Sequence, residues 1–234
     1  MKINVVTTWQ PGFPGGARFL SSFLAHWPRN ATLHLFLEGE PLNADTAQGY
    51  DPTRIVLHNL DADAERAAFL EAAPQDGRDY RQNARKFCHK VFSYTAQGVR
   101  DCDLLIWLDA DTETTAPIDA DWLEAVGPAG QGYSYLGRRD YEHTECGWLA
   151  FAMPECAALL DGIRRLYTTR RLLLLRGKTD CHAFDIARRA AGAEGRNLSA
   201  GAKGLHVWPQ TRLAECLDHH KGPERKAAAY GSAA

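Results

Sequence analysis

The chain has 234 residues, of which 45% are hydrophobic and 24% are charged, as in an ordinary globular protein. This length holds one large α/β domain or at most two small ones. The formal net charge of −2 gives no general attraction to nucleic acid or to anionic lipid. No apolar run approaches the roughly 20 residues that an integral membrane helix needs.

The first part of the chain alternates between predicted strands and predicted helices. A loop rich in proline and glycine follows the first strand, and Pro28 ends the first helix. Such alternation is typical of a largely parallel sheet. The patterns predict strands at 3–8, 32–38 and 54–57, and helices at 17–27 and 62–73.

A stronger helical pattern covers residues 80–97. Its apolar stripe, which includes Phe87 and Val91, is expected to face the core. Lys86 and Lys90 lie on the polar face, and Lys90 is a candidate to reach a phosphate group.

The second half of the chain is less regular and is read as part of the same domain. Asp180 is the predicted N-cap of a helix that ends at Gly192. We expect a single domain over residues 1–226 and a flexible C-terminal tail over 227–234. Further helices are predicted at 119–126, 154–167 and 180–191, and further strands at 133–136, 147–152 and 206–208.

The six cysteines contain no Cys-x-x-Cys pair. They are read as thiols of a reducing compartment rather than as a disulfide framework or a zinc site. The first residues are too short and too strand-like for a signal peptide. The expected location is therefore the cytoplasm, either free or peripheral to the inner face of a membrane.

The most informative segment runs from Leu104 to Asp111. Five apolar residues read as a buried strand and end in the triplet Asp109-Ala110-Asp111. Side chains two apart in a strand point to the same side, so both carboxylates can meet one ligand. Oxygen ligands favour Mg²⁺ or Mn²⁺. The alternative is a solvated turn, because Asp-x-Asp triplets are common by chance.

Four separated motifs together resemble glycosyltransferases of the GT-A fold, which use nucleotide-sugar donors. The first is the Asp109–Asp111 triplet after an apolar strand, and the second is the glycine-containing segment 144–151. The third is the acidic residue Asp180 at the start of a helix. The fourth is the tail from His219 to Gly222, followed by Lys226, which is similar to the His-x-x-Gly-x-x-Lys tail of glycogenin-like retaining enzymes.

The resemblance implies an α/β fold of GT-A (Rossmann-like) type, with a mixed, mostly parallel sheet flanked by helices. It implies that Mn²⁺ or Mg²⁺ is the cofactor and that His219 completes the metal site with Asp109 and Asp111, with His220 as the alternative ligand. It also implies that Asp180 acts at the anomeric carbon, unless it is only a helix cap. Donor contacts are expected at Thr7, Thr8, Trp9, Lys90, Asp109, Ala110, Gly147, Lys221, Gly222 and Lys226.

Some residues depart from the family pattern or have broader roles. Arg225 stands where the glycogenin-like tail has its lysine, and Cys181-His182 follows Asp180 where glutamine is usual. Glu145 is a further carboxylate near the predicted sugar pocket. Arg138, Arg139 and Asp140 are candidates for contacts with donor or acceptor hydroxyls.

The expected function is transfer of a sugar, with a UDP-sugar as the first choice of donor, to a carbohydrate or glycoconjugate acceptor. A metal-dependent nucleotidyltransferase is the main rival, although the glycines at 12–16 do not form a Gly-x-x-x-x-Gly-Lys-Ser/Thr loop. A non-catalytic sugar-nucleotide-binding protein and a nucleic-acid-modifying glycosyltransferase are two further hypotheses. The net charge argues against nucleic acid as a partner.

Overall fold

The apolar strand β4 (Leu104–Leu108) lies near the middle of the sheet in the computed structural model, and all of its side chains are buried. Ile106 and Leu108 face one hydrophobic core, whereas Leu105 and Trp107 face the other. Burial on both faces explains why this strand is wholly apolar rather than alternating. The structure describes residues 1–10, 13–39, 50–74, 79–140, 143–192 and 194–231.

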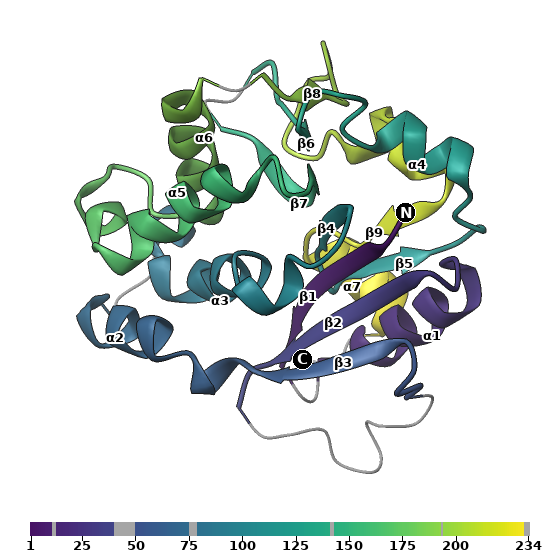
Figure 1. Ribbon diagram of the computed structural model, residues 1–234, viewed down its shortest axis with the longest axis horizontal. Coiled ribbons are helices and arrows are strands. Elements are labelled where there is room, and N and C mark those ends of the chain that lie inside the picture. The colour runs from purple at the N-terminus through teal and green to yellow at the C-terminus, as the bar shows by residue number, and fades with distance from the viewer. Residues whose placement is uncertain (11–12, 40–49, 75–78, 141–142, 193, 232–234) are drawn as a thin grey trace.

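Among the described residues, seven strands form one sheet in the order β3-β2-β1-β4-β7-β6-β8 (Figure 1). The first four strands of the chain are parallel, β7 is antiparallel to β4 and β6, and β8 is parallel to β6. This mixed, mostly parallel sheet confirms the predicted fold class. The remaining strands are β1 (Ile3–Trp9), β2 (Ala31–Leu37), β3 (Ile55–Asn59), β6 (Tyr133–Leu136), β7 (Glu145–Ala152) and β8 (Arg196–Asn197).

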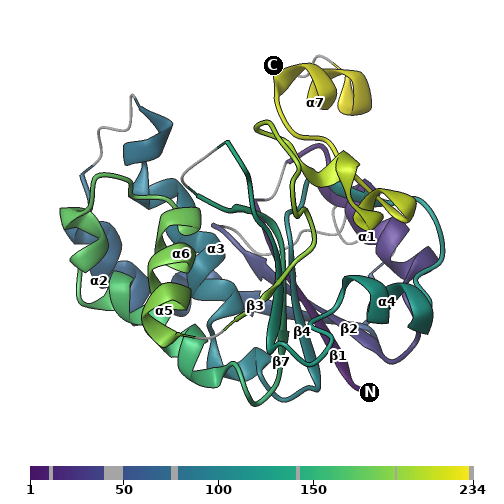
Figure 2. The ribbon, with the colours of Figure 1, turned by 90° about the horizontal axis from the view of Figure 1, so that it is seen from above.

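Helices cover both faces of the sheet, as Figure 2 shows edge-on. On one face lie α1 (Gly16–His26) and α4 (Ala120–Val126), whose side chains pack in a core rich in tryptophan. The other face carries a core rich in phenylalanine and tyrosine beneath four helices. These are α2 (Ala64–Ala72), α3 (Ala84–Tyr94), α5 (Ala157–Thr168) and α6 (Asp180–Ala191).

A two-stranded ribbon and a C-terminal helix complete the described fold. The strand β5 (Thr112–Thr114) follows the Asp109–Asp111 segment directly and pairs antiparallel with β9 (Leu217–His219). Helix α7 (Pro223–Tyr230) comes next, and its Tyr230 ring lies beside Arg18 in the first turn of α1 (Figure 1). The ribbon therefore brings the C-terminal part of the chain to the end of β4.

Several predicted elements need correction. Residues 80–97 are not one helix, because Asn83 caps α3 by accepting from the Lys86 amide, and short 3-10 turns flank it. Thr179, not Asp180, is the N-cap of α6, and Asp180 is the first helical residue. Residues 206–208, all within the described part of the chain, do not form the predicted strand. Trp208 instead begins a 3-10 turn, and Pro209 is the next residue of that turn.

The C-terminal segment contains a helix that the sequence pattern did not predict. Residues 227–230 belong to α7, where Tyr230 contacts the rings of Phe13 and His220. Residues 232–234 lie outside the described residues, as does Gly12 of the predicted glycine loop. The division into a domain and a tail stays a prediction.

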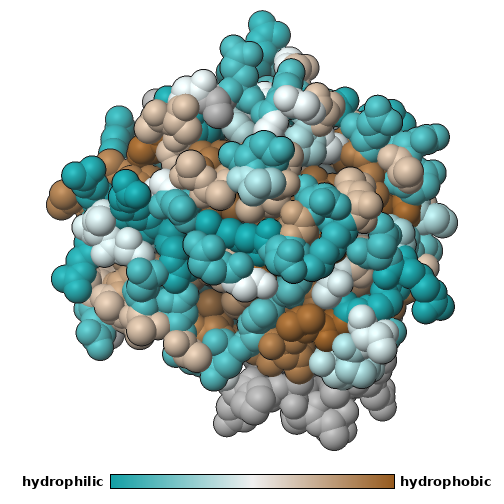
Figure 3. Space-filling view, in the orientation of Figure 1, coloured by the Kyte–Doolittle hydropathy of each residue, from teal (hydrophilic) through white to brown (hydrophobic). Residues whose placement is uncertain are grey.

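The face shown in Figure 3 is largely hydrophilic, with an apolar patch over the edge strand β3, where Val56 and Leu57 are partly exposed. No helix within the described ranges combines the length and the apolar character needed to cross a bilayer.

A buried histidine pair links β2 to β3. Nδ1 of His34 lies 2.9 Å from Nε2 of His58, and the two rings stack. Burial, with smaller effects of His58 and Lys2, lowers the pKa of His34 to about 4. A histidine in the unfolded chain has a pKa near 6.5. Between about pH 6.5 and pH 4, His34 therefore binds a proton in the unfolded chain but not in the folded protein. The stability of the fold therefore falls as the pH drops through this window.

We expect His34→Gln to reduce this acid sensitivity. Between pH 7 and pH 5 the variant should lose about 2 kcal/mol less unfolding free energy than the parent. Urea denaturation at both pH values measures the difference. The matched control is His26→Gln at the end of α1, which is not part of the pair. Equal losses in the parent and in His34→Gln would contradict the linkage.

Candidate active site

A cleft of about 610 Å³ opens at the carboxyl ends of β1 and β4. Ligands of open α/β sheets bind at this edge. Most of the predicted donor residues line it, but Thr7, which is fully buried, and Gly222 do not. The predicted residues on its wall are Thr8, Trp9, Lys90, Asp109, Ala110, Asp111, Gly147, Asp180, Lys221 and Lys226.

Asp109 and Asp111 on the wall of the cleft come together with the buried His219. Nε2 of His219 lies 3.2 Å from Oδ1 of Asp111 and 3.7 Å from Oδ2 of Asp109. One donor atom from each residue lies within 4.8 Å of the others. The arrangement is a set of two oxygens and one imidazole nitrogen that converge on one point.

Strand pairing positions the histidine. Thr112 and His219 are register partners in the β5–β9 ribbon, and the His220 amide donates to the Asp111 carbonyl. Consecutive side chains of a strand point to opposite sides, so the ring of His220 is directed to Glu113, with Nε2 3.4 Å from its carboxylate. The ribbon therefore brings His219, rather than His220, beside Asp109 and Asp111.

Gly147 makes room for this arrangement. A Cβ atom there would lie 2.8 Å from Cε1 and 3.1 Å from Nδ1 of His219, and 3.4 Å from Oδ2 of Asp109. The Asp109 amide also donates to the Gly147 carbonyl. Only glycine fits between the imidazole and the carboxylate without displacing one of them.

Lys90 joins Asp109 to Asp180. Its Nζ lies 2.7 Å from Asp109 and 3.0 Å from Asp180, and it also donates to the Cys146 carbonyl. Burial alone would lower the pKa of this ammonium, but the two carboxylates raise it well above its ordinary value. The indole Nε1 of Trp107 donates to the same Asp109 oxygen, and the Lys90 ammonium lies over the Trp107 ring. The side chain of Asp109 is thereby held from two sides.

Lys226, from the first turn of α7, lies 2.7 Å from Oδ2 of Asp111. Burial alone would raise the pKa of Asp111, but His219 and Lys226 lower it below its ordinary value. The Asp111 carboxylate is thus ionised and already attracts cationic partners.

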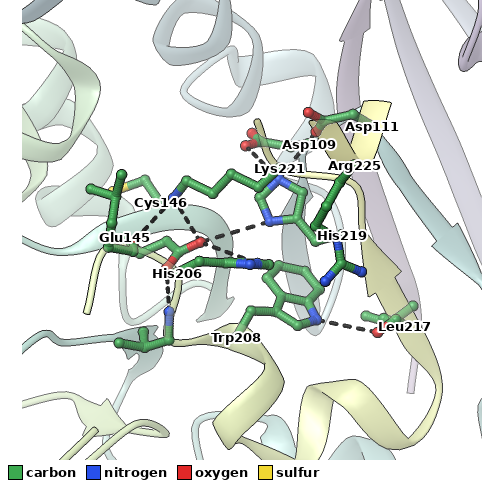
Figure 4. Close-up of polar contacts among 12 residues, drawn as sticks. Asp109, Asp111, Glu145, Cys146, His206, Trp208, Leu217, His219, Lys221 and Arg225 are labelled. Atoms are coloured by element: carbon green, nitrogen blue, oxygen red, sulfur yellow. Dashed lines mark hydrogen bonds and ion pairs between the residues drawn. The ribbon is translucent and has the colours of Figure 1, made fainter. Parts of the chain in front are cut away.

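Glu145 is the most buried acid of the site and is 1% exposed. Lys221 lies 2.8 Å from one of its oxygens, and the Val207 amide donates to the other. In Figure 4 the ring of His219 lies between this carboxylate and the Asp109–Asp111 pair. Burial lowers the pKa of the neighbouring His206 to about 4, although Glu145 opposes the shift.

Asp180 lies at the base of the cleft and is 3% exposed. Its carboxylate forms an ion pair with the Lys90 ammonium. One of its oxygens and the sulfurs of Cys146 and Cys181 lie within 4.8 Å of one another. All six cysteines of the chain are free thiols in the structure.

Thr8 and Trp9 line the cleft at the end of β1. Trp9 is only 4% exposed and its ring lies against Gly16, so it belongs mainly to the core. Its indole Nε1 has no hydrogen-bond partner among the described residues. Thr8 instead bonds the carboxyl of Glu38, whose pKa burial raises.

Sequence reasoning missed Glu38, His89 and His143 as lining residues. Glu38 follows β2, which is parallel to β1. A carboxylate directly after that strand could have been predicted to lie at the ligand-binding edge of the sheet. His89 adjoins Lys90 on α3. His143 lies in a loop, where no periodic pattern indicates direction.

No protein-family model and no curated protein sequence matches the chain. Solved structures do share its fold: the bifunctional glycosyltransferase WbbM, the glycosyltransferase GlyE of Streptococcus pneumoniae TIGR4 and mouse xyloside xylosyltransferase 1, each in its apo form. The TM-scores are 0.55, 0.52 and 0.55, and the sequence identities are 11%, 10% and 13%.

The matches cover 95%, 81% and 99% of this chain, in the same order. They cover 46% of WbbM and 44% of GlyE, so the chain spans less than half of each, but 94% of the xylosyltransferase. The chain therefore has the fold of these glycosyltransferases, which confirms the expected GT-A architecture.

We expect Gly147→Ala to disturb the Asp109–Asp111–His219 cluster while the fold survives. The added methyl group would push His219 away, so Mn²⁺ should bind about tenfold more weakly or worse. Titration calorimetry with Mn²⁺ alone measures this. Gly98→Ala is the matched control, because a Cβ there meets nothing within 4 Å. Unchanged Mn²⁺ affinity in Gly147→Ala would show that the cluster is not the metal site.

Proposed function

We propose that this protein is a metal-dependent glycosyltransferase. It would move a sugar, of hexose type, from a nucleoside diphosphate sugar to a hydroxyl of a carbohydrate or glycoconjugate. UDP is the nucleotide we expect. The observation that carries the proposal is the convergence of Asp109, Asp111 and His219 beside a large cleft, in a fold shared with glycosyltransferases.

The donor set fits a divalent cation. Two carboxylates and one imidazole suit Mn²⁺, which accepts both oxygen and nitrogen ligands, and Mg²⁺ is the alternative. Gly147 allows the His219 ring to lie close to the Asp109 carboxylate. Such an ion, when bound, supplies Lewis-acid stabilisation to the departing diphosphate.

The lysines of the site are placed to receive a diphosphate. Lys226 is bonded to Asp111 and Lys221 to Glu145, and both line the cleft. A second cation held by Asp111 would weaken the ion pair with Lys226, and the ammonium of Lys226 would then be available to a phosphate oxygen. Binding of the cation and of the donor would then reinforce each other.

The ends of β1 and β2 would hold the nucleoside. Thr8 and Glu38 offer a hydroxyl and a carboxyl at this end of the cleft, whereas the indole Nε1 of Trp9 is buried beside Gly16. The hydroxyl and the carboxyl can accept and donate hydrogen bonds to a base or a ribose.

Asp180 is the proposed group at the anomeric carbon. Lys90 fixes its carboxylate on the wall of the cleft. From there its negative charge can stabilise positive charge on the sugar, and the alternative role is removal of the proton from the acceptor hydroxyl. The anomeric configuration of the product distinguishes a retaining from an inverting reaction.

The six free thiols fit a reducing compartment, and we propose the cytoplasm as the location. Products separate sugar transfer from the rival reaction, because release of UDP or GDP indicates sugar transfer whereas pyrophosphate indicates nucleotidyl transfer. A protein that binds the donor without turnover would be a non-catalytic relative.

We expect UDP or another nucleoside diphosphate to raise the melting temperature only when Mn²⁺ or Mg²⁺ is present. At a ligand concentration of about 100 times Kd, the gain in unfolding free energy is about 2.7 kcal/mol. A thermal-shift screen of nucleotides and nucleotide sugars, with metal or with EDTA, measures this and identifies the donor. The gain should vanish in Asp111→Ala. A screen without any metal-dependent shift would refute the proposed donor site.

Asp180→Asn should reduce sugar transfer by a factor of at least about 100, because it removes the charge beside the reacting carbon. The metal-dependent stabilisation by nucleotide should persist, since Asp180 is not in the Asp109–Asp111–His219 cluster. Release of nucleoside diphosphate in the presence of acceptor measures the rate. Asp161→Asn, at an exposed position on α5, is the matched control. Full activity in Asp180→Asn would remove this residue from the mechanism.

A further inference from the structure

A second cavity, of about 430 Å³, adjoins the cleft. The two share Arg138 and His143 in their walls, so they are neighbouring compartments of one surface. The second cavity is bounded by the loops after β6 and β8 and by the later turns of α6. Four of its lining residues are arginines: Arg138, Arg139, Arg188 and Arg189.

The charge of this cavity is strongly positive. Asp185 is the one carboxylate among its described lining residues, and it is already engaged by Arg188 at 2.6 Å and by the amide and hydroxyl of Thr144. Burial and Arg138 lower the pKa of His143 to about 4, so this ring is neutral at pH 7. The excess of guanidinium charge stands out in a chain whose net charge is −2.

Two of the guanidinium groups are available to a ligand. Arg139 and Arg189 are exposed, and no residue in the described part of the chain forms an ion pair with either. The Arg139 amide donates to the Ala202 carbonyl, which fixes the backbone at the rim of the cavity. An arginine fork binds carboxylate and phosphate oxygens in a bidentate manner.

Helix α6 runs from the proposed reacting centre to this cavity, so its length gives the separation between them. Asp180 begins the helix at the cleft, and Asp185 and Arg189 follow five and nine positions later. At 1.5 Å per residue, they lie roughly 8 and 14 Å further along the helix axis. This distance matches the reach of a short oligosaccharide whose reacting hydroxyl lies near Asp180.

We propose that the arginine-lined cavity is the acceptor subsite and that it binds an anionic group, a carboxylate or a phosphate ester, on an acceptor glycan. The inference rests on the proposed glycosyltransferase function and names its acceptor class. Arg139 and Arg189 bind the anion, while Arg188, held by Asp185, forms the floor. The acceptor thus extends from the cavity into the cleft past Arg138 and His143.

The test compares glucuronate, glucose 6-phosphate and neutral glucose as probes in the presence of EDTA. Ligand-observed NMR titration should show binding of at least one anionic probe and none of glucose over the same range. The variant Arg139→Gln/Arg189→Gln should weaken that binding about tenfold, as loss of two exposed charge contacts predicts. Raising the salt concentration should weaken binding to the parent as well. The preferred anion identifies carboxylate or phosphate as the natural group.

The matched control is Arg165→Gln/Arg171→Gln, which removes the same charge from exposed positions outside the cavity. Equal loss in the control, unchanged affinity in the Arg139/Arg189 variant or equal binding of glucose would each overturn the proposal. The nucleotide screen is a separate measurement. Its failure would refute the donor site, whereas anion binding without metal reports on this cavity alone.

Discussion

Four carboxylates lie close together where β4 ends and where β7 and α6 begin. Because they repel one another, the side chains around them must supply positive charge. Asp109, Asp111, Glu145 and Asp180 are each bonded to a lysine. Partly buried acids at such spacing require opposite charge, because removing a carboxylate from water is costly unless it is paired. The lysines are therefore part of the scaffold as well as candidates for the diphosphate.

The required cations come from distant parts of the chain. Lys90 extends from α3, which packs on one face of the sheet, whereas Lys221 and Lys226 arrive with β9 and α7 at the C-terminal end. The β5–β9 ribbon brings the latter two into place together with His219. A short pair of strands thus determines both the third donor atom of the cluster and its charge balance.

The sequence predicted the features that depend on local pattern. The apolar run before Asp109 indicated a buried strand, and the carboxyl end of that strand is where the cleft lies. Features that depend on long-range pairing were not predictable in this way. Nothing in the local sequence indicates that Thr112 pairs with His219. Likewise, Arg189 is an ordinary surface residue until the fold brings it to the cavity that Arg139, a candidate already named from the sequence, also lines.

The pairing of β5 with β9 also bears on the order in which the molecule is made. A chain emerging from the ribosome presents Asp109 and Asp111 about a hundred residues before the histidine that joins them. Contacts of such long sequence separation form late in folding, because the entropy of closing the intervening loop must be overcome first. During synthesis Asp109 can already meet Lys90, which precedes it in the chain, whereas Asp111 still lacks both His219 and Lys226. The complete cluster becomes available only after the last strand has docked.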